Sequence, residues 1–543
     1  MKKHLFIALA ALGFAACAEK AETNVSANNG EKEQSYMAVT FTADGITRAT
    51  EGEFAEGTEA ERAVNSAYVF FFKENGEAFY VTDGNPSENA GSKNYIEVNL
   101  EKEGENMDNV SDVHKSVLVL KNYKGEYPAQ VVAVLNWDPT SQNSYTLENL
   151  QAKITSLGSD ADGYVMSNAV YMDFAGKAKY ATDLRIENIV KRTGNETEED
   201  AKARAAASPV VIQVERVAAK VEFDAKDGGK FHVGEVNGEP VYAQITGFEL
   251  YNDYDESWLI KRINTSWSNI ANFGMTNTWN DADWKRSYWA TSLGKAFENN
   301  TFSWNHNAEA EKYNSTVFVA DNTAPLYCGE NTREWDEAND VRTKVIVKAK
   351  LVKTDNSAVN LVNWYGKYYV GEDTVKAVVA NTLANNYYSG DGTNFTGIEG
   401  ADIECTMRDV ADAKAYEVYF QLSTTGANKN WYKYENGNYT YIDVPTMNNA
   451  LAAVEPALVY NDGMTYYYTN IEHLGTPGST TEFGVVRNHV YRVNITKIVG
   501  YGTPVYNGTT GFLTPEKPED VSTYVAAQIN ILSWRVVDPG YEI

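Results

Sequence analysis

The 543-residue chain is poor in the residues that build most catalytic and metal sites. It has three cysteines and six histidines, and no histidine lies in an HExxH pattern or beside a cysteine at zinc spacing. No GxSxG elbow, P-loop or GxGxxG loop occurs. The sequence therefore predicts no catalytic residue, no metal site and no cofactor, and an enzyme is the least favoured class.

Positive charge is also scarce. Lys and Arg total 47 against 74 Asp and Glu, which gives a formal net charge of −27. Such a surface repels phosphate backbones, so nucleic acid is excluded as an expected partner. The charge is typical of a protein kept soluble outside the cell.

Cysteine is too rare for a disulfide scaffold. Cys17 belongs to the leader described next. Cys328 and Cys405 remain, and the sequence leaves open whether they pair in an oxidising compartment or stay as two free buried thiols.

The first residues predict export rather than fold. Lys2 and Lys3 precede a short apolar run, and two alanines lead into Cys17. The run is too short to span a bilayer. Residues 1–17 are thus predicted to be a lipoprotein signal peptide with Cys17 as the acylated (palmitate-bearing) residue. The acyl chain would anchor the exported precursor in the outer membrane. Phe14 departs from the usual Leu, and ordinary secretion is the alternative.

Strand-like alternation dominates the remainder, and the length favours two domains. Strands are predicted at 37–42, 68–72, 117–120, 131–135, 210–214, 217–223, 241–250, 344–352, 415–422 and 489–498. Short helices are expected at 147–157, capped by Thr146, and at 198–207. The predicted division is a tether and removable first strand at 18–48, β-rich domains at 49–228 and 229–505, and a linker with a terminal strand at 506–543.

The two ends of the chain carry matching strand patterns. Met37, Val39 and Phe41 alternate near the start; Val525, Ala527, Ile529 and Ile531 alternate near the end. Arg48 lies between the first strand and the domain body, in a polar loop open to a trypsin-like protease. Cutting there would free the first strand and open a groove that a neighbour's terminal strand could fill, giving a filament. From the pattern alone, the two segments could equally pair within one chain.

Three blocks of sequence resemble one family. Residues 485–498, with Arg487-Asn488 followed by Tyr491, Val493 and Ile495, resemble the last core strand of the Mfa-type fimbrillins, the major subunits of type V pili. Residues 529–536, in which alternating apolar residues precede Trp534, resemble the family's C-terminal donor segment. Arg216-Val217-Ala218 resembles its R-x-A block. The linker before the donor segment is shorter than the family's.

The resemblance implies an all-β fold of two transthyretin-like β-sandwich domains with a few short helices, polymerised by donor-strand exchange. It implies cleavage after Arg48 by an Arg-specific protease, so that the mature subunit begins at Ala49 in a cell-surface fimbrium. The implied partners are copies of itself and accessory and anchor fimbrial subunits, in support of adhesion or biofilm formation. The alternatives are an anchor or tip subunit, and a surface glycan-binding lipoprotein that uses the six tryptophans between Trp258 and Trp304.

Overall fold

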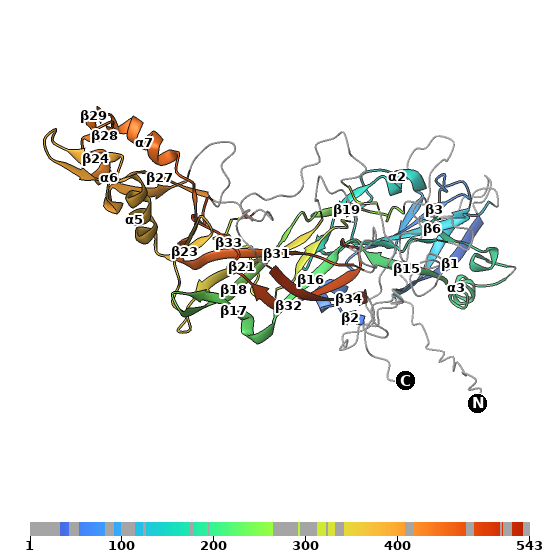
Figure 1. The fold of residues 1–543 in the computed structure, drawn as a ribbon. Helices are drawn as coiled ribbons and strands as arrows, with labels where there is room; N and C mark the ends of the chain where they lie inside the picture. The colour runs from blue at the N-terminus through green and yellow to red at the C-terminus, as the bar shows by residue number, and fades with distance from the viewer. Residues whose placement is uncertain are drawn as a thin grey trace.

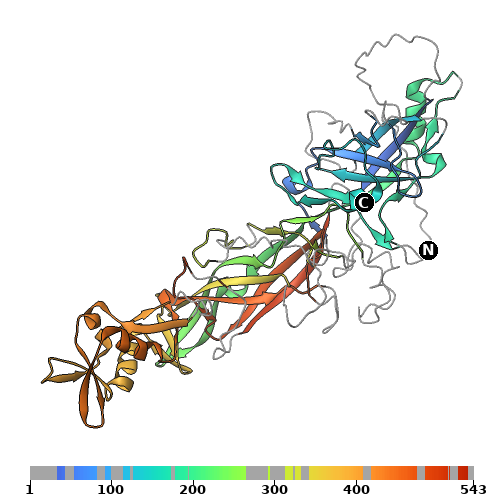
Figure 2. The same ribbon diagram turned by 90° about the horizontal axis from the view of Figure 1, so that it is seen from above.

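The computed structural model of the chain is elongated and built mostly of β-strands (Figure 1). The structure describes residues 33–42, 54–81, 92–98, 114–122, 126–172, 178–193, 195–263, 291–293, 312–321, 324–331, 342–407, 417–473, 483–510, 513 and 524–535. Figure 2 shows three groups of sheets following one another along the long axis. The predicted all-β class is confirmed.

The first group is a nine-stranded sheet. Its order is β14 (Val190–Lys191), β1 (Glu33–Thr42), β15 (Val210–Arg216), β10 (Met166–Asn168), β6 (Gln130–Leu135), β3 (Ala67–Phe72) and β4 (Tyr95–Glu97), with β5 (His114–Asn122) beside β1 and β13 (Thr182–Asp183) beside β6. Every residue of β3 is buried, as its uninterrupted apolar run predicts, because hydrophobic clusters cover both of its faces.

Short elements surround this sheet. They are α1 (Glu59–Arg62), α2 (Leu147–Gln151), α3 (Glu198–Ala206), the pair β8 (Gly158–Ser159) with β9 (Gly163–Tyr164), the pair β11 (Tyr171–Met172) with β12 (Ala178–Lys179), and β7 (Ile154–Ser156) with β19 (Glu256–Trp258). Thr146 caps α2 as predicted, but the helix ends at Gln151. The predicted extension to residue 157 is wrong, because Ile154 pairs with Trp258 in a strand instead.

The second group is a β-sandwich. One sheet runs β2 (Phe54–Glu56), β34 (Tyr524–Arg535), β32 (His489–Val499), β16 (Ala219–Ala225) and β20 (Leu326–Cys328); the other runs β17 (Lys230–Val236), β18 (Glu239–Tyr251), β21 (Lys344–Val352), β31 (Met464–Asn470) and β33 (Thr503–Pro504). Alternate residues of both sheets, such as Phe223, Phe248 and Val347, meet in one apolar core. The strands predicted in this part are confirmed.

Residues 361–460 form a third group, here called the distal module, inserted between the paired strands β21 and β31. It holds β22 (Leu361–Trp364), β23 (Lys367–Val370), β30 (Ala457–Tyr460), β27 (Glu417–Leu422) and β26 (Ile403–Thr406) in one sheet, and β25 (Phe395–Gly397), β24 (Tyr387–Gly390), β28 (Trp431–Glu435) and β29 (Asn438–Ile442) in another, with α5 (Glu372–Leu383), α6 (Thr424–Ala427) and α7 (Val444–Ala452). The module has its own core. It lies at the end of the molecule opposite β1 (Figure 2).

The chain leaves the nine-stranded sheet after Arg216 and enters the sandwich at Ala219, with Val217 and Ala218 between. The domain limits at 228 and 505 stay predictions, and this crossing favours an earlier first boundary. Cys328 lies in the sandwich core and Cys405 in the distal module, both as free thiols. The sequence left open a disulfide or two free thiols, and the structure shows two free thiols.

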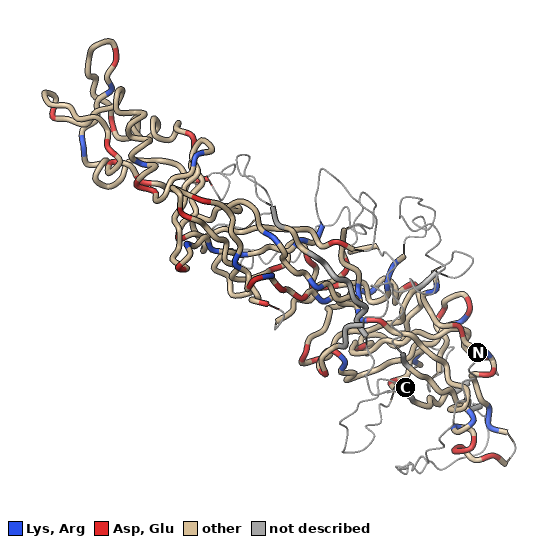
Figure 3. Tube along the Cα trace, turned by 60° about the horizontal axis from the view of Figure 1, so that its bottom comes forward, with Lys and Arg blue, Asp and Glu red and all other residues tan. Residues whose placement is uncertain are grey.

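Among the described residues, no helix combines the length and apolar character needed to cross a membrane. The same part of the chain holds no cluster of His, Cys, Asp and Glu arranged for a metal ion. Lys and Arg are interspersed with Asp and Glu along the length of the molecule (Figure 3).

Candidate assembly site

Strand β1, predicted to be removable, is paired along both edges. Its Glu33–Phe41 segment pairs antiparallel with β5. On the other edge it pairs antiparallel with β14 at Ser35 and Tyr36, and then parallel with β15 from Val39 to Thr42. The strand is therefore an interior member of the sheet, and its loss would leave unpaired edges on both sides.

One face of β1 enters the main core of the nine-stranded sheet. Met37 and Val39 are fully buried there, against Phe71 of β3 and Leu118 of β5 among others. Phe41 lies in the strand and pairs with His114. The site predicted for the removable strand is thus a groove lined by the apolar side chains of neighbouring strands.

The other face of β1 is covered as well. Tyr36 and Ala38 are buried against Ala201 and Ala205 of helix α3. Burial, the largest effect, raises the pKa of Tyr36, and Glu198 adds to it. The alternation in the sequence predicts that only the face of Met37, Val39 and Phe41 is buried. The structure buries the other face as well, because helix α3 lies over it.

Helix α3 has clear local reasons to form. The Thr197 hydroxyl accepts from the Asp200 backbone N–H at 3.1 Å, and the Asp200 carboxylate accepts from the Thr197 N–H in return. Glu198 and Glu199 place negative charge in the first turn. Alanine at positions 201 and 205, one turn apart, lets the helix approach β1 closely. The Ala-rich helix predicted at 198–207 is confirmed, and it spans Glu198–Ala206.

The predicted donor strand, β34, lies in the sandwich of its own chain. It pairs antiparallel with β32 and parallel with β2. Positions 527, 529 and 531 lie opposite the buried residues Ile495, Val493 and Tyr491. Ala527 packs against the sandwich core, whereas Ala526 is exposed. Strands β1 and β34 belong to different sheets, so they do not pair with each other in this chain.

Arg216, in the R-x-A block, joins the nine-stranded sheet to α1. Its side chain is fully buried and donates from Nε and Nη2 to the Glu61 backbone carbonyl at 2.9 and 2.7 Å. The Glu61 carboxylate meets Lys220 Nζ at 3.0 Å and accepts from the Tyr327 hydroxyl. Burial acts to raise the pKa of Glu61, but these two hydrogen bonds outweigh it and lower the pKa.

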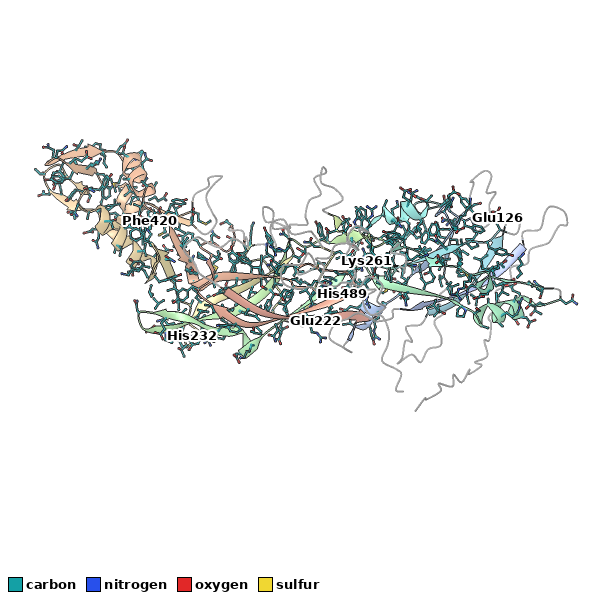
Figure 4. The ribbon with its side chains drawn as sticks, turned by 45° about the vertical axis from the view of Figure 1, so that its right-hand side comes forward. Glu126, Glu222, His232, Lys261, Phe420 and His489 are labelled. Atoms are coloured by element: carbon teal, nitrogen blue, oxygen red, sulfur yellow. The ribbon has the colours of Figure 1, made fainter. Side chains whose placement is uncertain are left out.

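Arg487, the first residue of the RN block, is buried at the same junction. Its Nη2 lies 2.8 Å from the Glu330 carboxylate, and it donates to the Trp258 carbonyl at 2.7 Å and the Ser257 hydroxyl at 3.1 Å. A fully buried guanidinium needs this many acceptors because it loses all of its hydration. Figure 4 places His489 and Lys261 in this central region, between the two groups of sheets.

The rest of the block shapes the entry into β32. Asn488 adopts a left-handed conformation with φ of 58°, donates from its backbone N–H to the Ala218 carbonyl at 2.8 Å, and accepts from the Arg216 N–H at 3.3 Å. The Tyr491 hydroxyl accepts from the Val486 N–H at 2.8 Å and lies 2.9 Å from His473 Nδ1. The RN block and the R-x-A block therefore build the joint between sheets.

Several joint residues carry no signal in the sequence. Glu61, Tyr327 and Glu330 are ordinary acidic and aromatic residues in a chain rich in both. The pair of Lys261 and Glu215, fully buried with a 3.6 Å separation, is equally hidden. The sequence points to them only indirectly, through Arg216 and Arg487. A buried arginine requires hydrogen-bond acceptors nearby, but the sequence does not say which residues supply them.

Some predicted site residues cannot be placed. Cys17, Arg48 and Ala49 lie outside the described residues, as do all of the clustered tryptophans except Trp258. Of Val525, Ile529, Ile531 and Trp534, only the backbone is described. Trp258 is buried and lies under the Arg262 guanidinium, 3.7 Å from its ring centre. Its ring is packed in the protein interior, so it does not serve as an exposed platform for a sugar.

Residues 458–539 match the family described as major fimbrial subunit protein type IV, fimbrillin, C-terminal. The chain carries a fimbrillin C-terminal region. This match includes both the Arg487–Ile498 block and β34, and it confirms the resemblance over that region. It supports the interpretation of the chain as a fimbrial subunit.

Solved structures with a weaker likeness come from Porphyromonas gingivalis and Parabacteroides distasonis. A fimbrilin (fimA) from Porphyromonas gingivalis W83 is 12% identical with a TM-score of 0.37, covering 92% of this chain and 98% of that chain. The tip fimbrial protein Mfa3 from Porphyromonas gingivalis is 11% identical, with a TM-score of 0.30 and coverage of 92% and 100%. A fimbrial assembly protein from Parabacteroides distasonis ATCC 8503 is 13% identical, with a TM-score of 0.27 and coverage of 75% and 98%. No curated protein sequence matches.

Proposed function

We propose that the protein is a structural subunit of a type V fimbria, exported as a lipoprotein acylated on Cys17 and cleaved after Arg48. The observation that carries this proposal is the position of β1. A segment joined to the rest through residues 43–53, which include Arg48, supplies an interior strand of the nine-stranded sheet. A cut in that connection would turn an integral strand into a separable peptide.

The vacated site would then take the C-terminal strand of a neighbouring subunit. The groove for Met37 and Val39 would hold Val525, Ala527, Ile529 and Ile531, with Trp534 beyond them. Main-chain pairing with β5 and β15 would supply the affinity, and alternate side chains the register. Because the donor and the groove lie on different parts of the subunit, the contact repeats head to tail and does not close.

The N-terminus of subunits purified from filaments tests this proposal. We expect a start at Ala49, and Arg48→Ala should leave the lipidated precursor on the cell and prevent filament growth. Arg62→Ala is the matched control, because Arg62 lies in α1 and donates to the Thr58 carbonyl. A mature start at Cys17 in filament subunits would instead indicate an anchor role.

Lipidation has a separate test. Cys17→Ser should remove the label from cells fed a radioactive fatty acid and leave the leader uncut, because the thiol is the acyl acceptor. An unlabelled wild-type protein would refute export as a lipoprotein, and would leave the cleavage and strand-donation steps to be judged on their own experiments.

A further inference from the structure

The distal module exposes a sheet face made of aromatic rings. Period-two alternation and the register of β25-β24-β28-β29 place six aromatic side chains on one face. They are Tyr388, Phe395, Tyr432, Tyr434, Tyr439 and Tyr441, here called the aromatic face. Tyr434, Tyr439 and Tyr441 are 36%, 40% and 60% exposed, so three neighbouring rings reach the solvent as one patch.

The opposite face of the same sheet holds it to the module. Trp431 is fully buried in the module core and donates to the Gly426 carbonyl at 2.9 Å. The charged side chains of β28, Lys433 and Glu435, alternate onto this side and pair with each other. The aromatic face therefore carries no charged residue from the four strands, although the chain as a whole is strongly acidic.

The rings support one another in fixed positions. Phe395 and Tyr439 stack with centroids 3.8 Å apart and planes within 3°. Tyr388 meets Tyr439 edge to face at 5.1 Å, and Tyr432 meets Tyr441 likewise at 5.7 Å. Only glycine fits at position 390, because a Cβ there would lie 2.2 Å from the Asn394 backbone oxygen and 3.0 Å from Phe395 Cδ1. Rings ordered in advance lose little entropy when a ligand binds.

The size of the aromatic face argues against a protein partner. Four strands spaced about 4.8 Å apart and up to five residues long, at about 3.3 Å per residue, span about 300 Å². A stable protein interface needs about 800 Å² from each partner. The absence of charge on the face argues against nucleic acid, whose stacking sites add basic residues. A small, uncharged ligand with both apolar and hydroxyl-bearing surfaces fits better.

We propose that the aromatic face binds a neutral oligosaccharide. Pyranose rings present apolar C–H faces that stack on aromatic rings, and their hydroxyls can form hydrogen bonds with the hydroxyls of the five tyrosines. The module lies at the end of the molecule away from β1 and from the joint (Figure 1), so a ligand there leaves both assembly strands uncovered. The proposal does not depend on filament formation, because the monomer carries the whole face.

Binding of the full-length monomer to an array of neutral oligosaccharides tests it, followed by calorimetric titration with cellohexaose, maltohexaose, xylohexaose and mannohexaose. We expect the wild type to bind at least one of these probes. Tyr434→Ala and Tyr441→Ala should each weaken that binding about tenfold, the loss expected when one stacked ring and its buried area are removed. The double variant should abolish it.

Two matched variants serve as controls and should bind as the wild type does. Thr440→Ala changes the exposed position between Tyr439 and Tyr441, on the opposite face. Tyr365→Asn removes a 69% exposed ring elsewhere in the module, and asparagine tolerates its φ of 49°. Unchanged melting temperatures show that all variants are folded.

The proposal is overturned if the wild type binds no neutral oligosaccharide at millimolar concentration, or if the double variant binds as well as the wild type. It is also overturned if the wild type sediments as a dimer in the absence of sugar while the double variant sediments as a monomer. In that case a second copy of the chain would occupy the aromatic face.

Discussion

At the scale of single residues, the RN and R-x-A blocks of the sequence meet specific backbone and hydrogen-bond requirements. Asn488 must adopt a left-handed φ and also accept a hydrogen bond from the Arg216 N–H. Asparagine is among the few residues that meet both needs, since it tolerates positive φ and carries a short acceptor. The RN pair therefore encodes a turn and a buried cation at one joint.

This assignment predicts an order of stabilities. Asn488→Gly keeps the backbone conformation and loses only the acceptor, which costs about 1–2 kcal/mol. Asn488→Ala loses both and should cost about 1 kcal/mol more, because alanine is strained at positive φ. Urea denaturation measures both. Asn436→Gly and Asn436→Ala are the control pair, at an exposed turn position with φ of 50°. There the two variants should differ in stability only by the strain of alanine at positive φ. Equal stabilities of the two Asn488 variants would show that the backbone conformation is unimportant.

Glu61 predicts how acid affects the joint. Burial favours its neutral form, but hydrogen bonds from Tyr327 and Lys220 prevail and hold its pKa below the ordinary 4.5. A carboxylate with a lowered pKa stabilises the fold fully above its unfolded pKa, and the stabilisation disappears as the pH falls through the lowered value. Glu61→Gln should therefore lower the free energy of unfolding at pH 7. Below pH 4.5, the free energy of unfolding of this variant should fall less steeply with pH than that of the wild type.

Denaturation curves between neutral and acidic pH make this measurement. Glu77→Gln is the matched control. Hydrogen bonds from Lys73 and Asn75 lower the pKa of Glu77 as well, but its pair with Lys73 is exposed, so the change in the acid limb should be much smaller than for Glu61→Gln. The role given to Glu61 is wrong if its glutamine variant loses stability in acid as steeply as the wild type.

At the scale of elements, the sequence predicts strands well wherever one pattern dominates. Strands β3, β21 and β32 lie where apolar runs or alternation place them. The helix from Thr146 was extended too far because Leu147, Leu150 and Ile154 fit a helical face, and only the distant pairing of Ile154 with Trp258 shows the break. Local pattern cannot report a partner about a hundred residues away.

The candidate site was predictable in the same uneven way. The alternation of Met37 and Val39 predicts a buried face, and the structure has it. The cover that Ala201 and Ala205 provide over Tyr36 could not be read from the strand itself, because a helix far along the chain supplies it. The roles of Cys17 in lipidation and of Arg48 in cleavage stay predictions.

Burial on both faces predicts that cleavage alone does not release β1. Met37, Val39 and Tyr36 are each worth about 1.5–3 kcal/mol of buried apolar surface. After cleavage at Arg48, the N-terminal peptide should therefore co-elute with the body in gel filtration. Tyr36→Ala should speed its release, because the contact with α3 is lost. Val211→Ala, at a 50% exposed position of the adjacent β15, should not. Immediate separation of the wild-type peptide would show that α3 does not retain the strand.

At the scale of the whole molecule, the proposed assembly uses two strand sites on different parts of the subunit. Strand β1 occupies the end of the molecule opposite the distal module, and β34 lies between them (Figure 1). If β34 leaves β32 and enters the groove of a neighbour, the subunit must remain folded without it. The structure favours this, because β32 still pairs with β16 and the buried residues of the core come from strands other than β34, with Ala527 packed at its margin.

Deleting residues 524–543 should therefore yield a folded monomer that does not extend a filament. In full-length protein, Ile529→Asp should also block extension, since position 529 lies opposite buried Val493, and an unpaired carboxylate in an apolar groove costs several kcal/mol. Gln528→Asp is the matched control. It lies opposite the half-buried Asn494 and should be tolerated, because the one-residue step moves the charge to the other face. Electron microscopy of protein cleaved at Arg48 provides the measurement. Normal filaments from the truncated chain would show that another segment joins the subunits, whereas an unfolded truncated chain would show that β34 is a permanent strand of its own sandwich.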